Sequence, residues 1–215
     1  MMRFDAVLFD CDGTLVESEY LGNRVMVQLA RRYGFSMSDS EARSLFRGRS
    51  MAACVADIEA QVGCKLPSSF VSDVRAAMDE AFRQELSTVP GVENVLCEIT
   101  VPICVASGAP LKKIQRVLEL THLSKWFGDK LFSSYELDMW KPDPDLFLYA
   151  AKELSVEPSQ CAVIEDSRVG VLAGVSAGMQ VFHYVPDRVS AFADHKQVVS
   201  FQSMDQLMPL LRQSR

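Results

Sequence analysis

Two acidic residues follow the first apolar segment of the sequence and could carry out chemistry together. Asp10 and Asp12 come directly after segment 6–9, and Cys11 lies between them. Carboxylates this close repel each other, so a nearby cation or a bound proton is needed to stabilise the pair. The spacing therefore indicates a site that binds a cation, transfers protons, or does both.

Polar residues also follow two later apolar segments. Ser107 comes after segment 102–106, and Glu165 and Asp166 come after segment 161–164. If these segments are parallel strands, their carboxyl ends lie at one edge of a sheet, and the side chains that follow them converge there. Carboxylates gathered at one point need a cation among them, and Mg²⁺ prefers oxygen ligands of this kind together with phosphate oxygens. The sequence therefore predicts a magnesium site at this edge.

A phosphate bound at the same edge also requires a positively charged protein group, and Lys141 is the candidate. The next residue, Pro142, favours an extended conformation at position 141. A helical pattern starts at Pro144, which is expected to anchor the loop that carries Lys141. The predicted ligand of this site is a small-molecule phosphate ester.

The elements that would position these residues are predicted from the apolar patterns. Short runs without polar alternation indicate buried parallel strands, and apolar residues at three- and four-residue spacing indicate helices. Their alternation after residue 100 predicts a doubly wound, Rossmann-like α/β sheet domain. The expected strands are 6–9, 102–106, 161–164, 179–184 and the less pronounced 130–133, and the expected helices are 110–120, 143–154 (with Asp143 as N-cap), 168–178 and 204–213.

Residues 16–87 have a different character. They contain helical patterns and no strand-like run, and Ser50 is placed to cap one of the helices. We expect an all-helical cap domain at 16–87, inserted into a core formed by 1–15 and 88–215, with 87–95 as the return linker. An insertion directly after the first strand is expected to lie beside the edge where open α/β sheets bind ligands.

Four short motifs, in this order, resemble those of the haloacid dehalogenase superfamily of phosphohydrolases: "DCDGTL", "ASG", "KPDP" and "EDS". The helical insertion resembles the cap of one branch of that superfamily, and the resemblance extends over essentially the whole chain. Within the branch, the sequence around the motifs resembles those of bacterial sugar-phosphate phosphatases of the 6-phosphogluconate type and of β-phosphoglucomutase-like proteins. The resemblance implies Mg²⁺-dependent hydrolysis of a small phosphorylated metabolite.

The resemblance also implies roles for individual residues. Asp10 would attack phosphorus and form an aspartyl-phosphate, and Asp12 would act as general acid and base. Both would contribute to the metal site, Asp12 through its backbone carbonyl.

Phosphate binding and the rest of the metal site are assigned by the same resemblance. Ser107, Gly108 and Lys141 would hold the transferring phosphoryl oxygens. Asp166 would bind Mg²⁺ directly, and Glu165 would support it directly or through water.

Substrate choice is expected to depend on the cap. Arg47 and Arg49 flank Gly48 before the helix that Ser50 caps, and could bind a carboxylate or a second anionic group of the substrate. Phosphoglycolate and carboxylated sugar phosphates are the candidates. An intramolecular phosphotransferase of the β-phosphoglucomutase type is the alternative reaction, although Gly22 stands where such mutases carry a histidine.

Composition sets broader bounds. The chain has 215 residues, 48% of them hydrophobic, and a net charge of −6. The acidic balance predicts no nucleic-acid partner, and the absence of an apolar stretch of about 18 residues predicts no membrane span. The six cysteines are scattered, which predicts reduced thiols in a cytoplasmic protein, and we expect a monomer. Cys11 is expected to be a buried filler, with a redox switch as the other interpretation.

Overall fold

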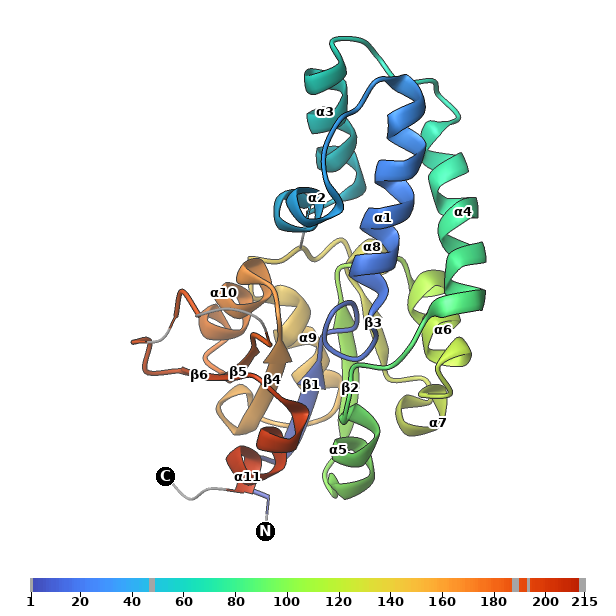
Figure 1. Cartoon of the computed structure of the whole chain (residues 1–215). Coiled ribbons are helices and arrows are strands. Elements are labelled where there is room, and N and C mark those ends of the chain that lie inside the picture. The colour runs from blue at the N-terminus through green and yellow to red at the C-terminus, as the bar shows by residue number, and fades with distance from the viewer. Residues whose placement is uncertain (1, 47–48, 187–189, 193, 213–215) are drawn as a thin grey trace. The chain divides into compact units, whose positions relative to one another are not determined.

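The computed structural model describes residues 2–46, 49–186, 190–192 and 194–212. The chain divides into two compact units (Figure 1). One unit consists of Met1–Val16 and Ser87–Arg215, and the other of Glu17–Leu86. They are called here the sheet unit and the helical unit.

The sheet unit is built on six parallel strands in the order β3-β2-β1-β4-β5-β6. The order reverses direction beside β1, which has β2 on one side and β4 on the other. This confirms the predicted doubly wound α/β fold. The strands are β1 (Ala6–Phe9), β2 (Ile103–Ser107), β3 (Leu131–Ser133), β4 (Cys161–Glu165), β5 (Gln180–Tyr184) and β6 (Val198–Phe201).

The strand register places the predicted site residues at one edge. Phe9, the last residue of β1, pairs with Val105 of β2 and with Ile164 of β4. Strand β4 continues for one residue and β2 for two residues beyond these positions, so the three strands end at nearly the same level. All strands run in the same direction, so this level is the carboxyl edge, where open α/β sheets bind their ligands.

Helices cover both faces of this sheet (Figure 1). Leu8 and Val163 point to one face, where they pack in a buried cluster with Phe147 of α9 and Val171 of α10. Phe9 points to the other face, where its ring meets that of Phe127 in α7 edge to face. The helices of this unit are α5 (Val92–Glu98), α6 (Leu111–Leu120), α7 (Ser124–Phe127), α8 (Ser134–Leu137), α9 (Asp145–Glu153), α10 (Arg168–Ser176) and α11 (Leu207–Arg212), with short 3₁₀ helices η2 (Pro158–Gln160) and η3 (Met204–Gln206).

Three local expectations are corrected. Strand β6 was not predicted, because its two middle residues are not buried and it lacks a continuous apolar run. The expected linker 87–95 contains the start of α5, whose apolar residues pack inward. Helix α9 has Pro144, not Asp143, at its N-cap position.

The helical unit has a core of its own. It contains α1 (Ser18–Ala30), η1 (Arg31–Tyr33), α2 (Asp39–Phe46), α3 (Met51–Val62) and α4 (Phe70–Glu85). Its buried apolar residues include Val27, Phe46, Ile58 and Phe70. The Ser50 side chain accepts a hydrogen bond from the backbone N–H of Ala53, as expected of an N-cap.

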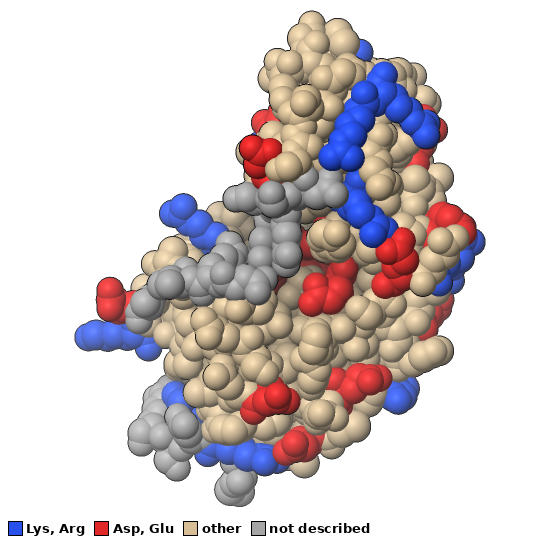
Figure 2. All heavy atoms as spheres, viewed as in Figure 1, with Lys and Arg blue, Asp and Glu red and all other residues tan. Residues whose placement is uncertain are grey.

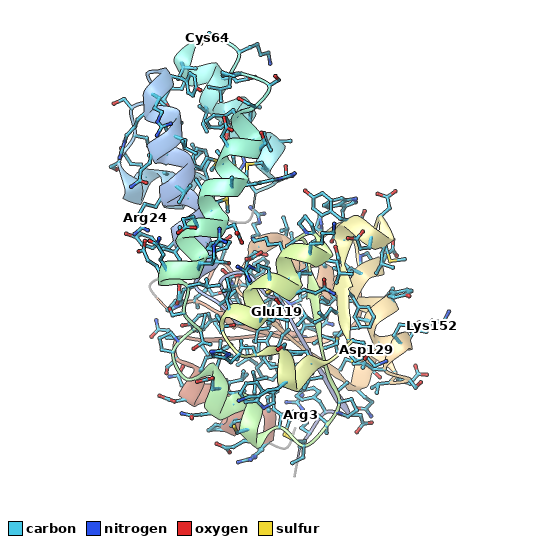
Figure 3. All side chains as sticks on the ribbon, turned by 90° about the vertical axis from the view of Figure 1, so that its right-hand side faces the viewer. Arg3, Arg24, Cys64, Glu119, Asp129 and Lys152 are labelled. Carbon is cyan, nitrogen blue, oxygen red and sulfur yellow. The ribbon has the colours of Figure 1, made fainter. Side chains whose placement is uncertain are left out.

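Basic side chains of the helical unit gather on one of its faces, as Figure 2 shows. Basic side chains of this unit also form ion pairs within it. Arg24 on α1, labelled in Figure 3, donates a hydrogen bond of 2.5 Å from Nη2 to Oε1 of Glu85 on α4. Across the described ranges of both units, no helix is long and apolar enough to cross a membrane.

Candidate active site

Three buried carboxylates meet at the carboxyl edge of the sheet. Asp10 follows β1, Glu165 ends β4, and Asp166 comes next. Each offers one carboxylate oxygen, and these three oxygens lie within 4.8 Å of one another. The side chains are almost inaccessible, with residue exposures of 7%, 0% and 1%. Parallel register accounts for the convergence, because β1 and β4 are neighbours in the sheet.

Lys141 provides the positive charge at this cluster. Its Nζ donates to Oδ1 of Asp10 at 2.7 Å and to Oε1 of Glu165 at 2.6 Å. The ammonium also lies 4.9 Å from the centre of the Phe147 ring on α9, a cation–π contact. Lys141 and Asp10 are 131 residues apart in the sequence, and the packing of α9 on the sheet brings them together.

The electrostatic balance of the cluster is unfavourable without a further cation. Burial raises the pKa of Asp10 well above its ordinary value; Lys141 opposes the rise, and Glu165 and Asp166 add to it. Burial alone would lower the pKa of Lys141, but Asp10 and Glu165 outweigh burial and raise it. When all are ionised, three carboxylates and one ammonium carry a net charge of −2. A divalent cation with hard oxygen preference fits this donor set.

Asp12 has a basic partner that the sequence analysis did not identify. Nζ of Lys113, in α6, lies 2.8 Å from both Oδ1 and Oδ2 of Asp12. Lys113 is one of two adjacent lysines on a helix with strong amphipathic character, which ordinarily indicates a solvated position. The partner lies 101 residues away, so only the tertiary fold reveals the pair.

Gly13 allows the chain to turn directly beneath Asp166. Its φ is +84°, in the left-handed region, and its N–H donates to the carbonyl of Val16 at 2.8 Å. A Cβ at this position would lie 2.6 Å from Oδ2 of Asp166, closer than non-bonded atoms approach. Glycine is therefore required both by the backbone angle and by the neighbouring carboxylate.

Ser107 and Gly108 lie at the same edge, Ser107 as the last residue of β2 and Gly108 directly after it. Ser107 is buried, and its Oγ accepts a hydrogen bond from the N–H of Ala109 at 3.2 Å. Gly108 is exposed, and a Cβ there would meet no atom within 4 Å. Their assignment to phosphate binding stays a prediction.

The two predicted cap arginines belong to the helical unit. Arg49 forms an ion pair with Asp57, with 2.5 Å between Nη1 and Oδ2. Arg47 lies outside the described residues. The role of both in binding an anionic substrate group stays a prediction.

His183 is a further residue near the acids that the sequence analysis did not assign to the site. It is buried on β5, with Nδ1 2.8 Å from Oγ of Ser190 and Nε2 3.3 Å from the carbonyl oxygen of Asp166. The neutral tautomer with a proton on Nε2 satisfies both contacts, because Nε2 then donates to the carbonyl and Nδ1 accepts from the hydroxyl. His183 thus connects the backbone of Asp166 to β5.

A doubly wound parallel sheet with buried carboxylates and a lysine at its carboxyl edge is a fold and site that suit a hydrolase acting on anionic substrates. The chain belongs to the haloacid dehalogenase-like hydrolases, whose family profile matches residues 4–178. This confirms the expected family.

The similarity extends to individual relatives. The 6-phosphogluconate phosphatase of Escherichia coli (strain K12) is 35% identical over 211 residues, which cover 98% of this chain and 96% of that protein. The validoxylamine A 7'-phosphate phosphatase of Streptomyces hygroscopicus subsp. limoneus is 31% identical over 179 residues, which cover 82% of this chain and 83% of that protein. A haloacid dehalogenase-like protein of unknown function from Agrobacterium tumefaciens str. C58 superposes with a TM-score of 0.85 at 26% identity, covering 97% of each chain. The expected enzyme class, a phosphatase, is confirmed at this level.

Proposed function

We propose that this chain hydrolyses the phosphate monoester of a small metabolite in the cytoplasm, acting as a monomer, with Mg²⁺ and an aspartyl-phosphate intermediate. The observation that carries the proposal is the position of Asp10. It stands at the carboxyl end of a central strand, bound to Lys141 and next to Glu165 and Asp166. A nucleophile for phosphoryl transfer needs positive charge around it and a fixed position, and both are supplied here.

In the first half of the proposed reaction, a carboxylate oxygen of Asp10 bonds to phosphorus as the bond from phosphorus to the ester oxygen breaks. Asp12 gives a proton to the departing oxygen, so the alcohol leaves neutral. The Lys141 ammonium stabilises the negative charge on the transferring phosphoryl group.

In the second half, the Asp12 carboxylate takes a proton from water. The water oxygen bonds to phosphorus, the bond between phosphorus and Asp10 breaks, and inorganic phosphate leaves. Both aspartates then return to their starting protonation states, so a single pair of carboxylates serves both steps.

Mg²⁺ would be held by the side chains of Asp10 and Asp166, with Glu165 and the backbone of Asp12 as further ligands. When bound, the ion would offset the repulsion between the Asp10 carboxylate and the phosphate dianion. The net charge of the acidic cluster supports this assignment, because a divalent ion neutralises it.

For the substrate, we propose a sugar phosphate or a carboxylated phosphate. The support is the relative that acts as a 6-phosphogluconate phosphatase over nearly the full length of this chain. We assign the choice of substrate to the helical unit, where basic side chains gather on one face (Figure 2). Arginine binds carboxylates through two parallel hydrogen bonds, which suits a carboxylated sugar phosphate.

The phosphotransferase alternative lacks support at position 22. Gly22 is buried in α1, and a Cβ there would lie 2.6 Å from the terminal methyl of Met78. A larger side chain would require Met78 to move. Position 22 offers no acid or base to assist transfer between two sugar oxygens.

Phosphate release from a panel of substrates tests the proposal. The panel contains 6-phosphogluconate, glucose 6-phosphate, phosphoglycolate and β-glucose 1-phosphate, each with Mg²⁺ and with EDTA. We expect the wild-type protein to release inorganic phosphate from at least one ester, and EDTA to abolish release. Asp10→Asn should lower kcat on the order of 10³-fold or more, because the amide is a poor nucleophile.

Asp5→Asn is the matched control, since Asp5 is an exposed acid directly before the N-terminal end of β1, whereas Asp10 follows its C-terminal end. It should keep wild-type kcat. Activity that survives Asp10→Asn would refute the assigned nucleophile. Conversion of β-glucose 1-phosphate to glucose 6-phosphate without free phosphate would instead establish the phosphotransferase.

A further inference from the structure

Both oxygens of the Glu165 carboxylate accept hydrogen bonds from protein groups. Its Oε1 accepts from Lys141 Nζ at 2.6 Å, and its Oε2 accepts from the N–H of Ser167 at 2.8 Å and from the Ser167 hydroxyl at 2.9 Å. The residue has no exposed surface. Glu165 thus links the first turn of α10 to the lysine that binds Asp10.

Gly170 lies against this carboxylate in the first turn of α10. Its N–H donates to the Ser167 hydroxyl at 3.1 Å, which caps the helix. A Cβ at position 170 would lie 1.7 Å from Oε1, 1.9 Å from Cδ and 2.5 Å from Oε2 of Glu165. All three separations are far shorter than van der Waals contact, so the carboxylate occupies the space that a side chain at position 170 would need.

Relief of the conflict requires the buried Glu165 carboxylate to move. Glu165 has zero exposure, and Oε1, the oxygen nearest to position 170, is the one that accepts from Lys141. A side chain at position 170 would therefore force the carboxylate to leave its position, and Lys141 would lose one of its two anionic partners. Buried ammonium groups are stabilised by such partners, so Lys141 would be held less firmly, by Asp10 and the Phe147 ring without Glu165.

We propose that Gly170 is a positioning residue: the missing side chain lets the Glu165 carboxylate lie against α10, and this carboxylate holds the Lys141 ammonium beside Asp10. The consequence for catalysis rests on the proposed function. The consequence for Lys141 does not, and it is measured separately.

Gly174 offers a matched control in the same helix. A Cβ there would lie 2.7 Å from Cγ2 of Val181 and 3.4 Å from Cγ1 of Val163. Both glycines are buried and both are close to neighbours. Alanine at position 174 therefore disturbs packing against β4 and β5, whereas alanine at position 170 disturbs the carboxylate that binds Lys141.

The first measurement is independent of any substrate. In ¹⁵N-lysine-labelled protein, a buried, hydrogen-bonded ammonium exchanges its protons slowly, so its Nζ signal is observed and is assigned by its loss in Lys141→Met. We expect Gly170→Ala to shift or abolish this signal and Gly174→Ala to retain it. An unchanged signal in Gly170→Ala would overturn the proposal, whatever the enzyme's substrate.

The second measurement uses the phosphate-release assay. Gly170→Ala should lower kcat about 100-fold or more, because positioning of charge around the transferring phosphoryl group is a main source of catalysis. Gly174→Ala should keep kcat within about threefold. If Gly170→Ala and Gly174→Ala lower kcat equally in an active enzyme, the role assigned to Gly170 is wrong. If no ester is hydrolysed by the wild-type protein, the proposed function fails while the NMR result still decides the positioning role.

A double variant separates this role from a general effect on folding. Glu165→Asp shortens the acid by one methylene and withdraws it from position 170. Combined with Gly170→Ala, it should fold even where Gly170→Ala alone does not, and its kcat should exceed the value expected if the two single effects multiplied. Multiplicative effects of the two substitutions would contradict a direct contact between these residues.

Discussion

At the scale of single residues, Lys113 is the least expected participant in the site. Both oxygens of Asp12 lie 2.8 Å from its Nζ, and the pair is only partly exposed. As the proposed general acid and base, Asp12 must face the leaving-group oxygen in one step and the water oxygen in the next. Its carboxylate therefore needs a defined orientation. Lys113 supplies that orientation from α6.

Removal of this lysine should slow the reaction without unfolding the protein. We expect Lys113→Met to lower kcat by about 10- to 100-fold, a fraction of the total contribution of general acid–base catalysis. Lys113→Arg should recover part of the loss, because it restores the charge. Lys112→Met is the control, since Lys112 is adjacent and exposed. Steady-state kinetics that show equal losses for the two methionine variants would contradict a specific role for Lys113.

The thiol of Cys11, between the two aspartates, should be unreactive. Burial raises the pKa of Cys11 well above its ordinary value, and the negative charges of Asp12 and Asp10 raise it further. Burial likewise raises the pKa of Cys54 and Cys161 to about 11. These three thiols therefore remain protonated at neutral pH. Because the thiolate is the reactive form of cysteine, they should react slowly.

Alkylation of the native protein at pH 7 checks this expectation. Iodoacetamide should label the exposed residues Cys64 and Cys97 first, whereas the buried thiols react only after unfolding in urea. Peptide mass spectrometry gives the order. Early labelling of Cys11 would favour the redox-switch interpretation over the buried filler.

At the scale of elements, the strands that carry the site could be predicted because β1, β2 and β4 are short apolar runs at whose ends polar residues stand. Asp10, Ser107 and Asp166 were placed at one edge by this rule alone. Strand β6 escaped because Val199 and Ser200 are not buried, so its pairing with β5 rather than its composition defines it. Lys113 and His183 were not predicted as site residues because their partners are distant in sequence. The sequence around a lysine on a helix or a histidine on a strand does not indicate which group it contacts.

Helix caps allow a test at this scale. Both Ser50 and Ser69 occupy N-cap positions in the helical unit, but only Ser50 accepts a hydrogen bond from the helix, from the Ala53 N–H at 3.2 Å. Ser50→Ala should therefore lower the free energy of unfolding by about 1 kcal/mol. Ser69→Ala should change it by less than about 0.5 kcal/mol. Urea denaturation measures both, and equal effects would show that the Ser50 hydrogen bond does not stabilise α3.

At the scale of the whole molecule, the two units divide the proposed work. The sheet unit holds the acids and the lysine that act on phosphorus. The helical unit has a separate core, so its surface can vary without disturbing the site. A family that keeps one reaction and changes its substrate benefits from such a division, because the residues that choose the substrate are not those that perform the chemistry.

Arg49 provides the test of this division. It pairs with Asp57, and their side chains are 38% and 32% exposed, so the pair contributes little to stability. If Arg49 binds the second anionic group of the substrate, Arg49→Ala should raise KM for 6-phosphogluconate about 10-fold and leave KM for glucose 6-phosphate within about twofold, with kcat unchanged for both. Arg83→Ala is the control, because Arg83 makes exposed ion pairs with Asp79 and Glu80 on α4. Equal changes in KM for the two esters would assign substrate choice to residues other than Arg49, whereas a change confined to the carboxylated ester would identify a carboxylate site in the helical unit.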